Sequence, residues 1–250
     1  RYTLPDGIVL RSMSGEHEWT QDVIALTSDD SARAGYSLDG GTSQTILSEE
    51  IDLLSPTTGK LNWVLGGSWL YRDVPWNSAS YNTFPPYSEA TPETVIGSIP
   101  LWQRQAGVFG QVNWQFTNTL QFQLGVRGNW ANNPGIGYLT IQIPGIPPLY
   151  VSNVSTFKGD ALTGKVGLNW TPIAGQYFYA FAARGYKPGT INPGISATPG
   201  SPSGSPDSKP EYLNDYEIGW KGRLAGGRIL TQLGGYWDDY QNMQQNIFYP

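Results

Sequence analysis

The sequence predicts an all-β protein, a segment of an antiparallel transmembrane β-barrel with about nine strands. Three observations predict this fold class. Apolar and polar residues alternate with period two along most of the 250 residues, whereas helical periodicity is rare. The connections between the alternating segments are alternately short and long, and tryptophans recur at the segment ends. Bacterial outer-membrane barrels combine all three features.

The alternation predicts nine strands, at residues 8–20, 44–55, 61–73, 104–116, 120–132, 157–171, 177–188, 211–225 and 228–248. In the strand at 61–73, Leu61 and Leu65 share one face, and Asn62 and Arg72 share the other. The strands at 104–116 and 120–132 repeat this pattern. In the next three strands, the apolar faces are expected to carry Leu162, Val166, Leu168 and Trp170, then Tyr177, Tyr179, Phe181 and Ala183, then Tyr216, Ile218, Trp220 and Leu224.

Three short turns set the pairing between neighbouring strands. Folding the chain at 117–119 pairs Trp114 with Phe122 and Asn113 with Gln123, so that apolar meets apolar and polar meets polar. The turn at 226–227 pairs Leu224 with Ile229, Trp220 with Leu233 and Lys221 with Gln232 in the same way. The turn at 57–59 is expected to set Leu53 against Trp63 and Ile51 against Leu65. All three are expected to be tight antiparallel hairpins.

The connections favour a membrane barrel over a soluble sandwich. Short ones fall at 56–60, 117–119, 172–176 and 226–227, and long ones fall near 21–43, 74–103, 133–156 and 189–210. Outer-membrane barrels have short periplasmic turns and long outer loops. The aromatic girdles expected at the two membrane interfaces consist of Trp63, Trp114, Trp170 and Trp220 near the short turns, and of Trp69, Tyr71 and Trp130 at the opposite ends. Because bacterial barrels have even strand counts, residues 1–250 are interpreted as part of a larger barrel domain.

Composition excludes several other classes of protein. The chain has 15 Lys and Arg residues against 20 Asp and Glu residues, and it has no cluster of basic residues that could bind a nucleic-acid backbone. There is no Cys and only one His, so neither a cysteine-based nor a histidine-rich metal centre is expected. No apolar run reaches 18 residues, which excludes a transmembrane helix. Two alternatives stay open: a passive, porin-like or structural barrel, and a secreted β module whose tryptophans bind glycans.

Several ordered motifs resemble one family. Residues 48–56, followed by Trp63 and Gly66, resemble a strand–turn–strand of TonB-dependent outer-membrane receptors. Residues 184–192 resemble that family's SRGYKxGGFN segment, although Pro188-Gly189-Thr190-Ile191 departs from its usual Gly-Gly-Phe run. The segments 210–222 and 236–244 resemble the two strands that follow.

The resemblance, over roughly residues 44–248, implies a 22-stranded barrel closed by an N-terminal plug domain. Such receptors take up scarce ligands, most often ferric siderophores, with energy passed through TonB. The expected partners are therefore outer-membrane lipid and lipopolysaccharide, the plug of the same chain, TonB through a segment upstream of residue 1, and a ferric chelate. The implied location is the bacterial outer membrane, and no cofactor is implied.

No catalytic set is expected. His17 lies near the outer end of a strand and is interpreted as a solvated rim residue. Glu49 and Glu50 are adjacent on a strand and point to opposite faces, so they cannot form an acid–base pair. A single His leaves no Ser–His–Asp set. The chain is interpreted as a non-enzyme.

Two groups of residues are candidates for ligand binding. Arg72, Arg127 and Arg184, with Tyr186 beside the last, are expected on the polar face, where they would form a cationic vestibule for anionic ligands. The structural alternative is that they pair with the plug or with other wall residues, such as Asp215, Glu217 and Lys221. The second group consists of aromatic residues in the predicted outer loops, which would enclose a planar ligand or pack loop against loop. Its members are Trp76, Tyr81, Tyr87, Trp102, Tyr138 and Tyr150.

Overall fold

The computed structural model describes residues 1–28, 35–82, 93–191 and 207–245. Within these residues, ten strands form one antiparallel sheet, in which each strand pairs with its neighbours in chain order. The strands are β1 (Tyr2–Thr3), β2 (Val9–Ser28), β3 (Gly35–Leu54), β4 (Leu61–Asn82), β5 (Glu93–Gln115), β6 (Leu120–Gln142), β7 (Leu149–Trp170), β8 (Gln176–Lys187), β9 (Glu211–Leu224) and β10 (Ile229–Gln241). A 3-10 turn, η1 (Ala225–Gly227), joins β9 to β10. The predicted all-β antiparallel fold is confirmed.

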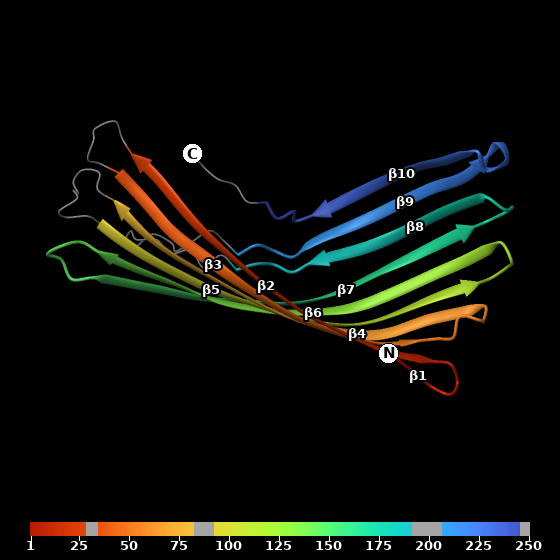
Figure 1. Ribbon diagram of the computed structural model, residues 1–250, viewed down its shortest axis with the longest axis horizontal. Helices are drawn as coiled ribbons and strands as arrows, with labels where there is room; N and C mark the ends of the chain where they lie inside the picture. Colours follow the sequence, from red (N-terminus) through yellow and green to blue (C-terminus); the bar gives the residue numbers. More distant parts are fainter. Residues whose placement is uncertain (29–34, 83–92, 192–206, 246–250) are drawn as a thin grey trace.

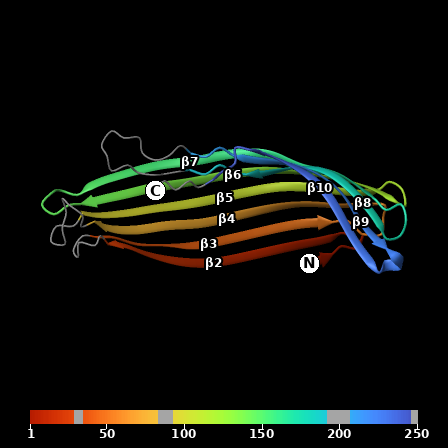
Figure 2. The ribbon, with the colours of Figure 1, turned by 90° about the horizontal axis from the view of Figure 1, so that it is seen from above.

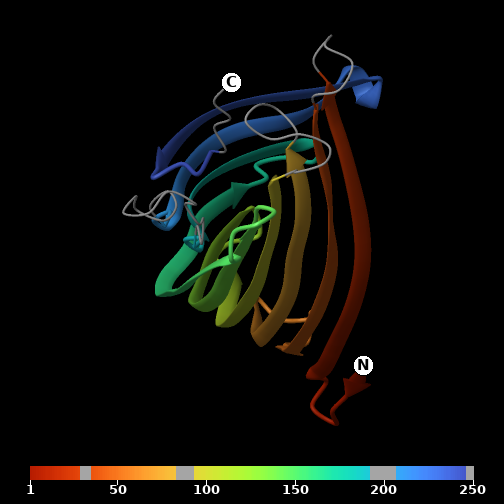
Figure 3. The same cartoon turned by 90° about the vertical axis from the view of Figure 1, so that its left-hand side faces the viewer.

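The sheet is a curved wall rather than a closed barrel. Figure 2 shows the long strands running side by side, and Figure 3 shows them arranged around an arc. Among the described strands, β10 pairs with β9 alone, so the sheet does not close on itself. All nine predicted strands are present, as β2 to β10, and the two-residue β1 is an addition. No helix in the described part of the chain is long and apolar enough to cross a membrane.

Six strands, β2 to β7, are much longer than the alternation predicted, whereas β8 and β9 keep their predicted lengths and β10 ends at Gln241 instead of residue 248. β4 continues to Asn82 and β5 starts at Glu93, whereas the prediction placed a loop over 74–103. The predicted loops at 21–43 and 133–156 are likewise mostly strand, and of the four long connections only the one between β8 and β9 keeps its predicted length. Figure 1 shows β2 to β7 extending well to the left of β8 to β10. Beyond the apolar band both faces of a strand are wet, so the alternation fades while backbone pairing continues.

Two of the three predicted registers are confirmed, and one is shifted. Val112 pairs with Leu124 across the β5–β6 turn, and Leu224 pairs with Ile229 across the β9–β10 turn. Across the β3–β4 turn, however, Leu53 pairs with Leu65 instead of Trp63. The backbone N–H of Trp63 donates to the Ser55 hydroxyl at 2.8 Å, which widens this turn beyond the predicted three residues. A shift of two residues keeps every side chain on its predicted face.

The two faces of the sheet differ in chemistry. One face, here called the outer face, carries large exposed apolar side chains, among them Leu65 (54% exposed), Leu124 (51%) and Ile218 (67%). The inner face carries a network of amides. The Gln123 amide donates to Asn113 Oδ1 at 2.9 Å, and the Asn169 amide donates to Gln121 Oε1 at 3.0 Å. In a transmembrane barrel the apolar face meets lipid and the polar face lines the lumen.

The six girdle tryptophans all pair with outer-face residues. Trp63 pairs with Val112, and Trp114 pairs with Phe122, near the short turns. Trp170 lies 5.4 Å from the Phe178 ring, which in turn lies 6.3 Å from Trp220. At the other end of the band, Trp69 and Trp130 both pair with Ala106. Their role as interface anchors stays a prediction.

The face prediction for β8 is wrong. Phe178 pairs with Trp170 on one side and Trp220 on the other, so Phe178 and every second residue after it lie on the outer face. Tyr177 and Tyr179 therefore lie on the inner face, although they were expected on the apolar one. Their hydroxyls make this possible, because they donate to Asn169 and Glu217. Alternation alone could not separate the two faces, since both carry aromatic residues.

Candidate functional site: the inner wall

Arg127 on β6 is the best-defined cation of the inner wall. Its Nε donates to Asn129 Oδ1 at 2.7 Å, and its Nη2 donates to the Ser68 hydroxyl at 2.7 Å. The guanidinium also lies over the Phe109 ring, 5.4 Å from its centroid. It occupies the space above Gly107, where a Cβ would come within 2.4 Å of Nη2. A glycine on β5 thus lets the arginine lie flat across the wall towards β4.

Arg72 on β4 is held in a similar way nearer the outer end of the strands. Its Nε donates to Gln44 Oε1 on β3 at 2.9 Å, and its Nη1 donates to Gln103 Oε1 on β5 at 3.4 Å. Both acceptors are neutral amides. Arg72 and Arg127 are therefore held in the same way, by uncharged amide and hydroxyl oxygens of the wall that fix the guanidinium without cancelling its charge.

The ion pairs among the described residues lie elsewhere. Arg11 binds Asp52 at 2.6 Å, and Asp52 is fully buried, with its Oδ1 beside Gly66. Lys187 and Glu211 are 3.8 Å apart near the outer ends of β8 and β9. Neither pair involves Arg72 or Arg127, so among the described residues no carboxylate forms an ion pair with either arginine.

The wall formed by β7 to β10 carries a different set of groups. Lys165 Nζ lies 3.9 Å from the centroid of Phe181, and Lys221 Nζ lies 5.6 Å from that of Tyr179. With Glu217, these residues line a hollow of about 370 Å³. This part of the wall therefore mixes both charges.

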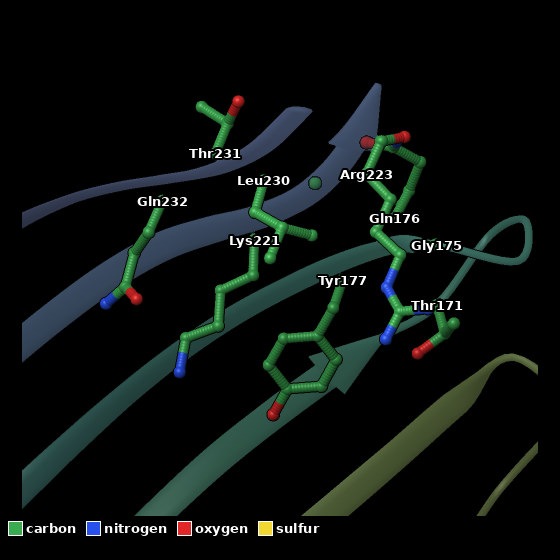
Figure 4. Close-up of a pocket in the computed structure, with 10 residues that line it drawn as sticks. Thr171, Gly175, Gln176, Tyr177, Lys221, Arg223, Leu230, Thr231 and Gln232 are labelled. Carbon is green, nitrogen blue, oxygen red and sulfur yellow. The ribbon is translucent and has the colours of Figure 1, made fainter. Parts of the chain in front are cut away.

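A second hollow, of about 540 Å³, lies beside it at the short-turn end. Figure 4 shows the side chains of Tyr177, Lys221 and Gln232 extending to the same side from three neighbouring strands.

Asp215 pairs directly with Asp238 on the neighbouring strand, so two carboxylates lie opposite each other. No group of three His, Asp or Glu residues suited to a metal ion occurs in the described ranges.

Arg184 does not join the predicted cationic vestibule. It pairs with Gly164 and Asn214 on the outer face, its Nη1 lies 3.5 Å from Asn214 Oδ1, and its guanidinium lies 4.4 Å from the Tyr212 ring centroid. The expectation that it faces the lumen is therefore wrong, for the same reason that inverts β8. The Tyr186 ring packs 5.5 Å from Tyr212, and its hydroxyl is buried.

The aromatic candidates are not brought together, and those that the structure describes are not in loops. Trp76 lies in β4 and pairs with Ile99 on the inner face. Trp102, Tyr138 and Tyr150 lie in β5, β6 and β7 and belong to the outer face. Tyr81 is the second-last residue of β4, with a side chain outside the described part, and Tyr87 lies outside the described residues. Of this group, the structure places Trp76 alone on the inner wall.

Sequence reasoning missed a contact between the β8–β9 connection and the inner wall. Ile191 is 9% exposed, and its Cδ1 lies where a side chain on Gly135 would be. The amide of Asn133, itself 3% exposed, donates to Gly189 O at 3.3 Å. The one hint of this contact in the sequence was the Pro188–Ile191 segment, which departs from the Gly-Gly-Phe run of the family motif that it otherwise resembles.

A protein-family model with the description "TonB dependent receptor-like, beta-barrel" matches residues 9–250 of this chain. Among solved structures, the ferric yersiniabactin uptake receptor FyuA from Yersinia pestis aligns at a TM-score of 0.57 and 15% identity, over 94% of this chain and 37% of that one. The siderophore receptor PiuA from Acinetobacter baumannii aligns at a TM-score of 0.49 and 12% identity, over 90% of this chain and 40% of that one. A search of curated protein sequences found no match.

The chain thus spans less than half the length of these two receptors. The likeness to FyuA supports the fold, and the match to the family model covers nearly the whole chain. Members of the family are transport receptors of the bacterial outer membrane, which is where this chain resides. The chain belongs to the TonB-dependent receptor-like β-barrel family.

Proposed function

We propose that this chain forms part of the wall of a receptor that actively imports a scarce anionic ligand, a ferric siderophore or a similar chelate, with energy supplied through TonB. The observation that carries the proposal is the placement of Arg72 and Arg127 on the inner wall with neutral partners. A guanidinium held by amides keeps its charge, and a lumen with low-dielectric walls focuses that charge onto an entering anion.

The remaining partners belong to the same proposal. Residues 1–250 form a partial barrel domain, whose inner wall contacts a plug from the same chain. TonB acts on a segment upstream, while lipid and lipopolysaccharide contact the outer face. The receptor binds no cofactor, metal centre or nucleic acid of its own, and it performs no catalysis. The large exposed apolar side chains of the outer face argue against the alternative of a soluble glycan-binding module.

The test uses the complete parent receptor and two iron-55 probes, an anionic ferric catecholate and an uncharged ferric hydroxamate. Arg127→Gln should weaken binding of the anionic probe by about ten- to a hundredfold, since a hydrogen bond to a charged group contributes about 1.5–3 kcal/mol. Lys165→Gln is the matched control, because that cation already faces the Phe181 ring. Equal effects of both variants on the anionic probe would refute the role of Arg127.

An uptake assay in cells distinguishes active import from passive diffusion through a porin-like barrel. Uptake of the probe should stop when TonB is deleted, although binding to the cell surface should persist. Uptake that continues without TonB, in proportion to the external concentration, would identify a porin-like barrel instead.

A further inference from the structure

Prolines occur in three neighbouring strands of the wall at about one height. They are Pro75 on β4, Pro100 on β5 and Pro134 on β6, and Pro75 pairs directly with Pro100. All three lie just beyond the upper aromatic girdle. Proline has no backbone N–H, so within a sheet it is normally confined to edge strands, strand starts and bulges. Its repeated use inside this sheet marks a place where the ladder is deliberately weak.

The missing donors all fall on ladders between hairpins. In an antiparallel sheet, consecutive residues of a strand bond alternately to its two neighbours. The Gln115 N–H donates to Lys60 O, which with the printed registers fixes this alternation for β4 to β6. Pro75 therefore lacks its donor towards β3, whereas Pro100 lacks its donor towards β6 and Pro134 towards β5. None of the three removes a bond within the hairpins β4–β5 and β6–β7.

The strand pairing is interrupted at the same places. Between β3 and β4, pairing stops at Thr45 with Asp73 and resumes at Thr42 with Trp76, on the two sides of Pro75. This interruption is called here the first seam.

The interruption between β5 and β6 is longer and is called here the second seam. Over residues 99–103 of β5, Leu101 alone pairs with β6 among the described residues, and its partner is Gly135. Within the hairpins, in contrast, pairing runs on without a break, and it includes Pro134 with Thr156. At this height the wall is thus divided into hairpins that are each intact but weakly joined.

Buried polar atoms without a partner flank both seams. Thr42 Oγ1 lies beside the first seam, and the Oδ1 atoms of Asn132 and Asn133 lie beside the second. None of these atoms accepts or donates a hydrogen bond in the described structure, and Asn133 is only 3% exposed. Such groups disfavour the closed arrangement, because water can satisfy them only when the strands part.

Side chains hold the seams closed from the inner face. At the first seam, Arg72 donates from β4 to Gln44, a β3 residue that has lost its ladder pair. At the second seam, the β8–β9 connection places Ile191, 9% exposed, where a side chain on Gly135 would be. The Asn133 amide donates to the backbone of the same connection at 3.3 Å. The second seam therefore depends on a connection that belongs to neither hairpin.

We propose that the outer parts of the hairpins β4–β5 and β6–β7 move as separate bodies, which part and rejoin along the second seam, with Ile191 as the latch. The prolines act as the hinge, since they remove bonds between hairpins and leave each hairpin its own ladder. Pairing below the seams is continuous, so the motion is confined to the wall beyond the upper girdle. The inference does not depend on the proposed iron uptake.

The test is amide hydrogen exchange of the complete parent receptor, resolved by residue with mass spectrometry and electron-transfer fragmentation. In the outer part of β6, the N–H groups of Ile136, Tyr138 and Thr140 point to β5, and those of the odd-numbered residues between them point to β7. The even-numbered amides should exchange about tenfold or more faster, since two bonds are missing from this seam and each contributes about fivefold. Fraying of the whole outer wall would expose both classes together, so equal rates would overturn the proposal.

Two variants should move the rate of the even-numbered class in opposite directions. Pro134→Val restores a donor towards β5 and should slow exchange about fivefold. Ile191→Ala removes the latch and should accelerate exchange about tenfold or more, because a buried isoleucine loses its apolar contacts. The matched controls are Pro144→Val, in the turn between β6 and β7, and Ile173→Ala, which is 67% exposed in the turn between β7 and β8. Neither control should change the rates.

The outcomes separate the hinge from the latch. A Pro134→Val variant that exchanges like the wild type would overturn the hinge, and an Ile191→Ala variant that matches Ile173→Ala would overturn the latch. If either variant fails to assemble, the two rate classes of the wild type still decide the proposal, because they need no substitution.

Discussion

Leu124 and Gln123 offer the sharpest test of which face meets lipid. The two residues are adjacent on β6, and Leu124 is 51% exposed on the outer face between Val112 and Val166. It lies about midway between Leu120 at the short-turn end and Trp130 at the other end of the apolar band. Leu124→Arg therefore places a guanidinium near the bilayer midplane, where an arginine costs about 2–4 kcal/mol.

Gln123→Arg introduces the same guanidinium on the inner face. It gives up one hydrogen bond to Asn113, worth about 1 kcal/mol, and the new side chain meets Gly167 on β7, which has no side chain of its own. The lumen is wet, so the charge stays hydrated. We expect the free energy of unfolding to fall by about 1 kcal/mol or less for Gln123→Arg and by about 2–4 kcal/mol for Leu124→Arg.

The assay is reversible folding of the complete parent barrel into lipid vesicles across a denaturant series, with heat-modifiable gel migration to confirm assembly. Both variants add the same side chain to the same strand, so differences in strand propensity and net charge cancel. Equal losses, or a larger loss for Gln123→Arg, would show that the assignment of the two faces is inverted.

Three further predictions follow from single contacts. Gly107→Ala puts a Cβ 2.4 Å from the Arg127 guanidinium, so it should weaken anionic-ligand binding while leaving net charge unchanged; unaltered affinity in a binding titration would contradict the ligand role of Arg127. Arg11→Ala leaves the fully buried Asp52 carboxylate without its partner and should lower the free energy of unfolding by about 2–3 kcal/mol. This value is discounted for solvent screening because Arg11 is 40% exposed. Adding Asp52→Asn to Arg11→Ala should recover part of the lost stability, as measured by denaturant unfolding. Phe178→Ser should impair membrane assembly more than Tyr177→Ser, which loses one bond to Asn169; the reverse order in a folding assay would restore the original face prediction for β8.

The sequence by itself determined the fold class, the order of the long strands and the face of the sheet on which most side chains lie. Period-two alternation needs only the geometry of a strand and a difference in polarity between its faces, and β5 and β6 show both clearly. The hairpins at 117–119 and 226–227 follow because their apolar and polar pairs agree in one register. Arg72 and Arg127 fall on the inner face by the same argument.

Where alternation carries no information, the tertiary structure alone decided which way the side chains face and how far the strands extend. Both faces of β8 present aromatic rings, so its orientation depends on Phe178 lying between Trp170 and Trp220 on two other strands. The outer extensions of β2 to β7 lie beyond the apolar band, where pairing leaves no polarity pattern. The neutral partners of Arg127 come from β4 and β6, and its space comes from a glycine on β5. Long-range pairing therefore decides which cations face the lumen and which, like Arg184, face the membrane.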